Sequence, residues 1–206
     1  MITILDYGLG NIRAFVNVYK RLNISVKIAR RPDDLSDASK IILPGVGAFD
    51  YAMQMLNNSG MRQELERQVV INKKPIIGIC VGMQMLAKSS EEGVLPGLGW
   101  VDATVKRFNP DLIPYKTKLP HMGWNNITPV GHSDLLDGFN NESRFYFLHS
   151  YYVVCNNEND IIALSDYGSE FVSGINSSNI YGIQFHPEKS HSNGIKLLNN
   201  FACLQQ

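Results

Sequence analysis

Residues 74–86 constrain the fold of this chain most, because they change from a strand pattern to a helical pattern around a cysteine. After a proline, a short apolar run predicts a buried strand, and apolar residues at helical spacing follow it. Gly78 and Gly82 each lie two residues from Cys80. Since glycines carry no side chain to block a sharp turn, the sequence predicts a nucleophile elbow with cysteine in the place of serine.

Such an elbow would place the sulfur of Cys80 at a helix N-terminus, where unpaired N–H groups and the helix macrodipole favour the thiolate. The thiolate is the nucleophilic form of cysteine. The alternative interpretation is an inert residue buried in a core strand, which is common for free cysteines. The cysteine motif alone leaves both interpretations open.

Residues 180–189 supply the other groups that a nucleophilic cysteine needs. Alternating residues up to Phe185 predict a strand, and a proline follows, so His186 and Glu188 are expected in the turn beyond it. A cysteine nucleophile needs a base, and the base needs a third group that fixes its tautomer. Cys80, His186 and Glu188 are therefore a candidate catalytic triad, because such groups meet in the fold rather than along the chain.

Both stretches resemble the motifs of class I (triad-type) glutamine amidotransferases, P-x-x-G-x-C-x-G-x-Q followed by Q-F-H-P-E. Within that family, four further segments are similar to the glutaminase subunits of imidazole glycerol phosphate synthases, namely residues 6–11, 44–49, 120–125 and 185–190. The resemblance runs nearly from end to end. It implies hydrolysis of L-glutamine by a catalytic triad of Cys80, His186 and Glu188, with no metal and no organic cofactor.

The order of the predicted elements indicates an α/β fold. Residues 2–6 and 25–29 predict strands, a third apolar run ends at Pro44, and amphipathic helices lie between them. This alternation predicts a doubly wound, mostly parallel sheet with helices on both faces, as in the flavodoxin-like fold of the family. After Trp100, short strand-like runs indicate an added antiparallel portion. No linker or repeat is visible, so residues 1–206 are expected to form a single glutamine amidotransferase domain.

The glycine-containing segment after Pro44 is a candidate oxyanion site. Open α/β sheets build their sites at the carboxyl ends of strands, and a loop with two glycines can turn N–H groups towards a developing oxyanion. The resemblance assigns the oxyanion hole to the amides of Val46 and Val81, and it places Gly47 beside the glutamine. A glycine turn without chemistry is the alternative.

The resemblance implies further substrate contacts. Gln84 lies one turn into the predicted helix, where its amide is expected to contact glutamine; outside this motif, a helix glutamine is usually only a surface residue. The turn at Ser150 and Tyr151 is expected to hold glutamine by main-chain contacts. The neighbouring His149 is interpreted as a satisfied core histidine that at most orients this turn.

Other residues are expected to contact a partner. Asn11 is a possible N-cap after the first strand, in a turn that faces the partner in the resembled subunits. Met122 and Trp124 are large apolar residues in an expected loop, which is typical of a contact surface. By resemblance, they and Lys189 would contact a cyclase (synthase) subunit in a heterodimer, although isolated lysines are normally only solvated.

Composition argues against several other partners. Because 19 basic residues balance 19 acidic ones, no general attraction to nucleic acid or membrane is expected. The three cysteines lack the spacing of a metal site or disulfide framework, which favours reduced thiols in a cytoplasm. No signal segment or membrane-spanning apolar run is visible, so a cytoplasmic protein is expected.

Three functions remain open from the sequence. The first is the glutaminase subunit that passes ammonia to a cyclase making imidazole glycerol phosphate in histidine biosynthesis. The second is a paralogous subunit that supplies ammonia for amidation of a surface-polysaccharide sugar, because the motif residues are shared by both. The third is a non-catalytic α/β binding subunit, against which the complete set of Cys80, His186 and Glu188 argues.

Overall fold

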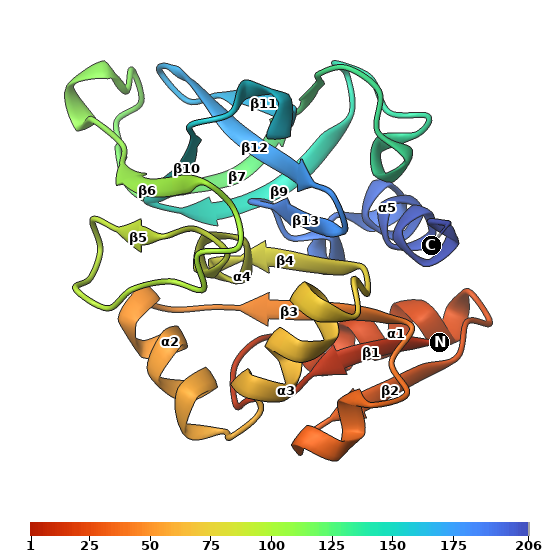
Figure 1. Ribbon diagram of the computed structural model, residues 1–206. Coiled ribbons are helices and arrows are strands. Elements are labelled where there is room, and N and C mark those ends of the chain that lie inside the picture. Colours follow the sequence, from red (N-terminus) through yellow and green to blue (C-terminus); the bar gives the residue numbers. More distant parts are fainter. Residues whose placement is uncertain (206) are drawn as a thin grey trace.

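The computed structural model describes residues 1–205, in which one long mixed sheet is covered by helices (Figure 1). The α-helices are α1 (Ile12–Arg21), α2 (Phe49–Asn58), α3 (Arg62–Glu66), α4 (Val81–Met85) and α5 (His191–Cys203). The strands are β1 (Ile2–Leu5), β2 (Val26–Ala29), β3 (Lys40–Gly45), β4 (Ile76–Cys80), β5 (Ser89–Ser90), β6 (Ala103–Arg107), β7 (His121–Asn126), β8 (Thr128–Pro129), β9 (Arg144–His149), β10 (Tyr151–Cys155), β11 (Ile161–Asp166), β12 (Glu170–Ser177) and β13 (Ile180–Ile183).

One half of the long sheet is parallel, with the strand order β2-β1-β3-β4-β13. In its centre, Ile77 of β4 pairs with Ile42 of β3 on one side and with Tyr181 of β13 on the other. Every residue of β4 is buried, because helices cover both faces of a parallel sheet. Figure 1 shows α3 in front of β1 and β3, and α1 behind them. The predicted doubly wound, mostly parallel sheet is confirmed.

The other half of the sheet is mainly antiparallel. It continues from β13 through β12, β10 and β6, and β11 pairs with β12. A separate two-stranded sheet joins β7 to β9, with His121 opposite His149. The antiparallel portion expected after Trp100 is therefore present.

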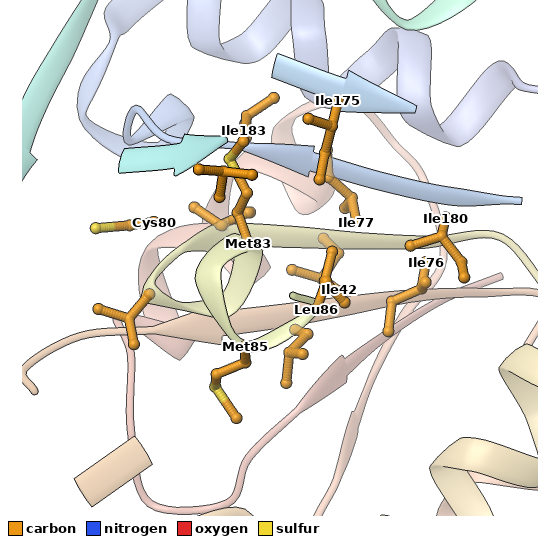
Figure 2. Packing of buried hydrophobic residues seen from close by; sticks show 14 of the residues in the cluster. Ile42, Ile76, Ile77, Cys80, Met83, Met85, Leu86, Ile175, Ile180 and Ile183 are labelled. Carbon is orange, nitrogen blue, oxygen red and sulfur yellow. The ribbon is translucent and has the colours of Figure 1, made fainter. Parts of the chain in front are cut away.

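The core forms because each element places its apolar residues on the sheet side. In α1, the buried Phe15 and Tyr19 lie one turn apart, and the Tyr19 hydroxyl donates a hydrogen bond of 3.1 Å to the carbonyl of Leu198 in α5. Figure 2 shows Ile77 and Ile183 among the buried residues that surround α4. Burial of each side chain of this size contributes about 1.5–3 kcal/mol. Among residues 1–205, no helix has the length and apolar character needed to cross a membrane.

The expectation that Pro44 ends its strand is wrong. The strand β3 continues to Gly45, which pairs with Cys80. The hydroxyl of Tyr7 donates a 2.7 Å hydrogen bond to the Pro44 carbonyl from beyond the end of β1. The N–H and C=O groups of one strand residue point to the same neighbouring strand. The missing N–H of Pro44 therefore lies on the side of β1, which has already ended at this level, so no strand is left unpaired there.

One other boundary and one element type differ from expectation. The strand predicted to reach Phe185 ends at Ile183, because the chain then turns from β4 towards β9, where the His186 N–H donates to the Tyr146 carbonyl at 2.8 Å. The expected loop that carries Met122 is the strand β7. Its alternation is obscured in the sequence by polar residues and by Gly123, which has a φ of 133°.

The interpretation of Asn11 as an N-cap is also wrong in one respect. Its side chain makes no capping hydrogen bond to α1, although its carbonyl accepts the first bonds of the helix from Ala14 and Phe15. With φ −89° and ψ 63°, Asn11 lies outside the extended region that N-cap residues normally adopt.

Candidate active site

Cys80 lies at a sharp turn between β4 and α4. Its φ is 56° and its ψ is −113°, a conformation that costs a non-glycine residue about 1–3 kcal/mol. Close backbone packing holds the turn, since a Cβ atom on Gly82 would overlap the carbonyl oxygen of Leu43 and one on Gly78 would lie 2.5 Å from the Gly82 oxygen. Figure 2 shows the Cys80 side chain projecting from the end of β4, away from the packed isoleucines. The expected elbow is therefore present.

His186 is fixed between a carboxylate and the main chain. Its Nδ1 lies 2.9 Å from Oε1 of Glu188, and both side chains are almost fully buried. The His186 carbonyl accepts a 2.6 Å hydrogen bond from the Ser190 hydroxyl, which ties the main chain of His186 to the following turn. Within residues 1–205, the other carboxylate oxygen of Glu188 is buried without a hydrogen-bond partner. The interaction of Glu188 is therefore concentrated on His186.

The electrostatic environment favours a protonated His186. Burial lowers the pKa of this ring, but hydrogen bonds to Cys80 and Glu188, and the negative charges of both groups, raise it to about 10. The Cys80 sulfur also lies 3.7 Å from Nε2 of Gln184, an N–H donor. Such surroundings suit a thiolate paired with an imidazolium, which is the activated form of a cysteine nucleophile.

A cavity of about 270 Å³ opens beside Cys80. Residues predicted from the sequence to act in catalysis, oxyanion binding, substrate binding or partner contact form most of its lining: Val46, Gly47, Cys80, Val81, Gln84, Ser150, Tyr151, His186 and Lys189. Glu188 does not line the cavity and lies behind His186, to which it is hydrogen-bonded. The volume is near the lower end of about 300–1,000 Å³ for small-molecule sites.

The two expected oxyanion donors lie on adjoining elements. Val46 follows Gly45, whose register partner is Cys80, and Gly47 follows with a φ of 87°. Val81 is the first residue of α4, where an amide N–H has no acceptor within the helix. Both residues border the cavity. The arrangement is suited to the predicted oxyanion hole.

Gln84 is held more tightly than its sequence suggests. It is 2% exposed, and its Nε2 donates to the Tyr151 carbonyl at 3.1 Å and to Oε1 of Gln184 at 3.0 Å. Both donor hydrogens are thereby used within the protein. A contact with a substrate would therefore go through the carbonyl oxygen of Gln84.

Residues 3–204 match the family model described as glutamine amidotransferase class-I. The chain belongs to this family. The amidotransferase is 56% identical over 204 residues to "Imidazole glycerol phosphate synthase subunit HisH" of Bdellovibrio bacteriovorus, an alignment that covers 98% of this chain and 99% of that protein. It is 50% identical to the protein of the same name from Leptospira interrogans, covering 99% and 100% of the two chains.

Solved structures show that the amidotransferase shares its fold with more distant proteins. A structure described as a glutamine amidotransferase matches with a TM-score of 0.73 at 19% identity, covering 98% of both chains. The structure of PurLQS from Thermotoga maritima matches with a TM-score of 0.72 at 19% identity, covering 98% of this chain and 96% of the other. The family resemblance inferred from the motifs is confirmed, whereas the roles of individual residues stay predictions.

Four cavity or contact residues of the amidotransferase were not singled out in the sequence: Glu92, Pro120, Leu148 and Gln184. Glu92 lines the cavity, and its Oε2 accepts a 2.9 Å hydrogen bond from the N–H of Phe49 at the start of α2. Gln184 contacts both Cys80 and Gln84. Pro120 also reaches the cavity. Gln184 had a local signal as part of the Q-F-H-P-E motif, and Pro120 lies in the segment 120–125 that resembles the family. Within residues 1–205, no group of three or more histidines, cysteines or carboxylates is placed to hold a metal ion.

The expected partner residues of the amidotransferase lie outside or at the edge of the cavity. Met122 and Trp124 are 63% and 40% exposed on β7, and the ring of Trp124 stacks on His191 at 5.2 Å. Lys189 is exposed, with its Nζ 5.5 Å from the centre of the Tyr146 ring. Asn11 is exposed before α1, a helix that contacts the turn carrying Lys189. The structure therefore presents exposed apolar and cationic groups that a partner could contact.

Proposed function

We propose that this chain is the glutaminase subunit of an imidazole glycerol phosphate synthase and supplies ammonia for histidine biosynthesis. The similarity at 56% identity over nearly the full length of a HisH protein carries this proposal. The names of these relatives favour histidine biosynthesis over the polysaccharide alternative. We further propose that residues 1–206 form one amidotransferase domain. A cytoplasmic location stays a prediction, and the three free cysteines are compatible with it.

In the first half of the proposed reaction, the thiolate of Cys80 attacks the side-chain amide carbon of L-glutamine. A carbon–sulfur bond forms and the carbonyl electrons move to oxygen, where the amides of Val46 and Val81 stabilise the negative charge. The oxyanion then collapses and the carbon–nitrogen bond breaks. His186 gives its proton to the departing nitrogen, so neutral ammonia leaves and a thioester remains.

In the second half, water attacks the thioester. His186, now neutral, takes a proton from this water, and the carbon–sulfur bond breaks to release glutamate and regenerate the thiolate. Glu188 holds Nδ1 of His186 throughout and stabilises its positive charge. No metal or organic cofactor is needed for either step.

The cavity also offers groups for recognition of the substrate. Glu92 is a carboxylate in the cavity wall that would attract the α-ammonium group of glutamine. Ser150 and Tyr151 lie at the junction of β9 and β10, where their main chain can bond to the substrate, and Gly47 borders the same space. A site of this size fits one amino acid.

A heterodimer with a cyclase subunit would receive the ammonia. Free ammonia is mostly protonated in water at neutral pH, so direct transfer is required for efficient use. Met122 and Trp124 are the apolar residues proposed to contact this subunit, with Asn11 and Lys189 at the same interface. Exposed aromatic residues of this kind are frequent energetic centres of protein–protein interfaces.

The test is glutamate release from glutamine by the purified chain, alone and then with the cyclase of the histidine pathway and the nucleotide substrate of that cyclase. We expect strong stimulation by the cyclase, and loss of stimulation by at least about tenfold when Met122→Ala and Trp124→Ala are combined. Lys27→Ala, a change at an exposed ion pair with Asp37, is the matched surface control. Hydrolysis that stays low with the cyclase would instead favour the paralogous function.

A further inference from the structure

A chain of hydrogen bonds joins β7 to the turn that borders the cavity. The amide Nδ2 of Asn125 lies 3.3 Å from Nε2 of His121. Nδ1 of His121 lies 3.0 Å from Nε2 of His149, and Nδ1 of His149 lies 2.8 Å from the Tyr151 carbonyl oxygen. His121 and His149 are opposite each other in the β7–β9 register, so strand pairing brings their rings together.

The donor and acceptor of every hydrogen bond in this series can be assigned by starting at the Tyr151 carbonyl. The Tyr151 carbonyl can only accept, so Nδ1 of His149 carries the proton and, in a neutral ring, Nε2 of His149 accepts. Nδ1 of His121 must then donate, which leaves Nε2 of His121 as an acceptor. Asn125 supplies the donor that this acceptor requires.

The hydrogen bonds of Asn125, at the β7 end of the series, lead to the same assignment of donors and acceptors. The Oδ1 atom of Asn125 accepts from the N–H of Asn126 at 2.8 Å, and its Nδ2 donates to the Asp166 carbonyl at 2.7 Å. These two bonds fix the orientation of the amide, so Nδ2 is the atom that faces His121. Both ends therefore require the same tautomer, with the proton on Nδ1, in His121 and in His149.

Burial keeps this pair uncharged. His121 and His149 are 4% and 6% exposed. Burial lowers the pKa of His121 to about 4, and burial together with the charge of His121 lowers the pKa of His149 to about 3. At neutral pH each ring carries one proton, as the chain of bonds requires.

The hydrogen-bonded carbonyl belongs to the site itself. The oxygen of Tyr151 accepts from His149 and also from Nε2 of Gln84, and all three residues line the cavity. Two donors on one carbonyl restrict rotation of the Tyr151–Tyr152 peptide unit, which directly follows the turn at Ser150 and Tyr151. The position of this turn therefore depends on a ring that is itself held from β7.

We propose that His149 and His121 are positioning residues for glutamine, which act in series to hold the Tyr151 carbonyl and so the substrate-binding turn. This inference rests on the proposed glutaminase function and adds specific residues to it. Neither ring takes or gives a proton during the reaction. Their contribution is to binding of glutamine, whereas Cys80 and His186 carry the chemical steps.

A purely structural role for these rings makes a different prediction. His121 stacks on Tyr167 and Phe147, with ring centres 4.1 and 4.9 Å apart, so part of its contribution is aromatic packing. Phenylalanine preserves packing and removes the hydrogen bonds. Asparagine at position 149 is the complementary change, because its amide N–H can take the place of the Nδ1 donor of His149.

The experiment compares His149→Phe, His149→Asn and His121→Phe with the wild-type chain in the complex with the cyclase. Glutamate release gives KM and kcat for glutamine. Loss of one net hydrogen bond predicts that His149→Phe raises KM about five- to tenfold with less than about threefold change in kcat. His149→Asn is expected to stay within about threefold of wild type in KM, and His121→Phe to lie between the two.

A second measurement reads the hydrogen bonds directly. Long-range ¹H–¹⁵N correlation spectra of histidine-labelled protein distinguish rings with the proton on Nδ1 from rings with the proton on Nε2. We expect the Nδ1–H form for both rings in the wild type. In His121→Phe, His149 should keep this form, because the Tyr151 carbonyl still requires the donor, and the Nε2 resonance of His149 should shift as the hydrogen bond from His121 is lost.

The outcomes separate this inference from the proposed function. An active wild-type complex whose KM is unchanged in His149→Phe, or whose rings carry the proton on Nε2, overturns the positioning role and leaves the glutaminase function intact. A wild-type complex that releases no glutamate overturns the proposed function and this inference with it. A rise in KM that His149→Asn reverses supports the positioning role.

Discussion

Two groups of buried histidines approach the same cavity and behave in opposite ways. His186 lies beside Cys80 and Glu188, which raise its pKa to about 10 in spite of burial. His149 and His121 face each other and a main-chain carbonyl, and burial lowers their pKa values to about 3 and about 4. Burial acts in the same direction on all three rings. The adjacent negative groups therefore decide which histidine can carry charge at neutral pH.

This contrast divides the site by task. A ring that gains and loses a proton needs partners that stabilise both of its states, and Glu188 supplies this for His186. A ring that only holds the substrate turn needs one fixed state, and a neutral environment supplies this for His149. Substitutions at these residues and titration of the rings test this division.

Removal of the nucleophile should have the largest effect. Cys80→Ala is expected to lower glutamate release by about 10⁴-fold or more, because no other group in the cavity can form the thioester. The pKa of His186 should also fall, since a hydrogen bond and a negative charge are lost, whereas His149 should remain neutral. Glutamate assays and NMR titration of the imidazole protons measure both effects. An unchanged melting temperature is the control for folding, and unchanged hydrolysis would contradict the assignment of Cys80 as the nucleophile.

Neutralising the carboxylate should have the next largest effect. Glu188→Gln is nearly isosteric, but it removes the charge behind His186 and can donate a proton to Nδ1, which favours the wrong tautomer. We expect kcat to fall by about 10²- to 10⁴-fold and the pKa of His186 to move towards its ordinary value. A variant with wild-type kcat and an unshifted His186 would show that Glu188 has no role in catalysis.

The last effects concern stability as a function of pH and leave the chemistry of the reaction aside. The folded pKa of His186 lies above the unfolded value, so its stabilisation is complete below about pH 6.5 and is lost as the pH rises through about 10. His121 and His149 have lowered pKa values, so their stabilisation is present above about pH 6.5 and is lost as the pH falls towards about 4 and about 3.

Denaturant unfolding between pH 4 and pH 10 measures the free energy of unfolding along both the acid limb and the alkaline limb of the stability profile. His186→Gln should flatten the alkaline limb, and His121→Phe combined with His149→Phe should flatten the acid limb. For each titrating ring that is removed, the slope of the free energy of unfolding should fall by up to about 1.4 kcal/mol per pH unit. If both variants instead changed the same limb, the contrast between the two groups of histidines would be wrong.

The features predicted correctly from the sequence are those with local causes. The turn at Cys80 follows from two glycines and a change of hydrophobic period within a few residues, and the His186 turn follows from a proline. The parallel sheet follows from alternation of strands and helices along the chain. Each of these signals lies within a short window.

The features that were missed depend on pairing between distant segments. The strand that carries Met122 is stabilised by its partner β9, more than 20 residues later, so its own pattern of polar and glycine residues was misleading. His121 acquires its role only because that register places it opposite His149. Glu92 reaches the cavity from a glycine-containing loop with no motif of its own. Such positions are set by tertiary structure rather than by local sequence.

The fixed proton of His149 has a consequence for the product. In the proposed reaction, ammonia forms in a space bordered by two imidazole rings, His186 and His149. His186 has just given up its proton to the departing nitrogen, and the single proton of His149 is committed to the Tyr151 carbonyl. Neither ring is then a ready acid. The molecule that leaves keeps its lone pair, which is the form of nitrogen that can attack an acceptor.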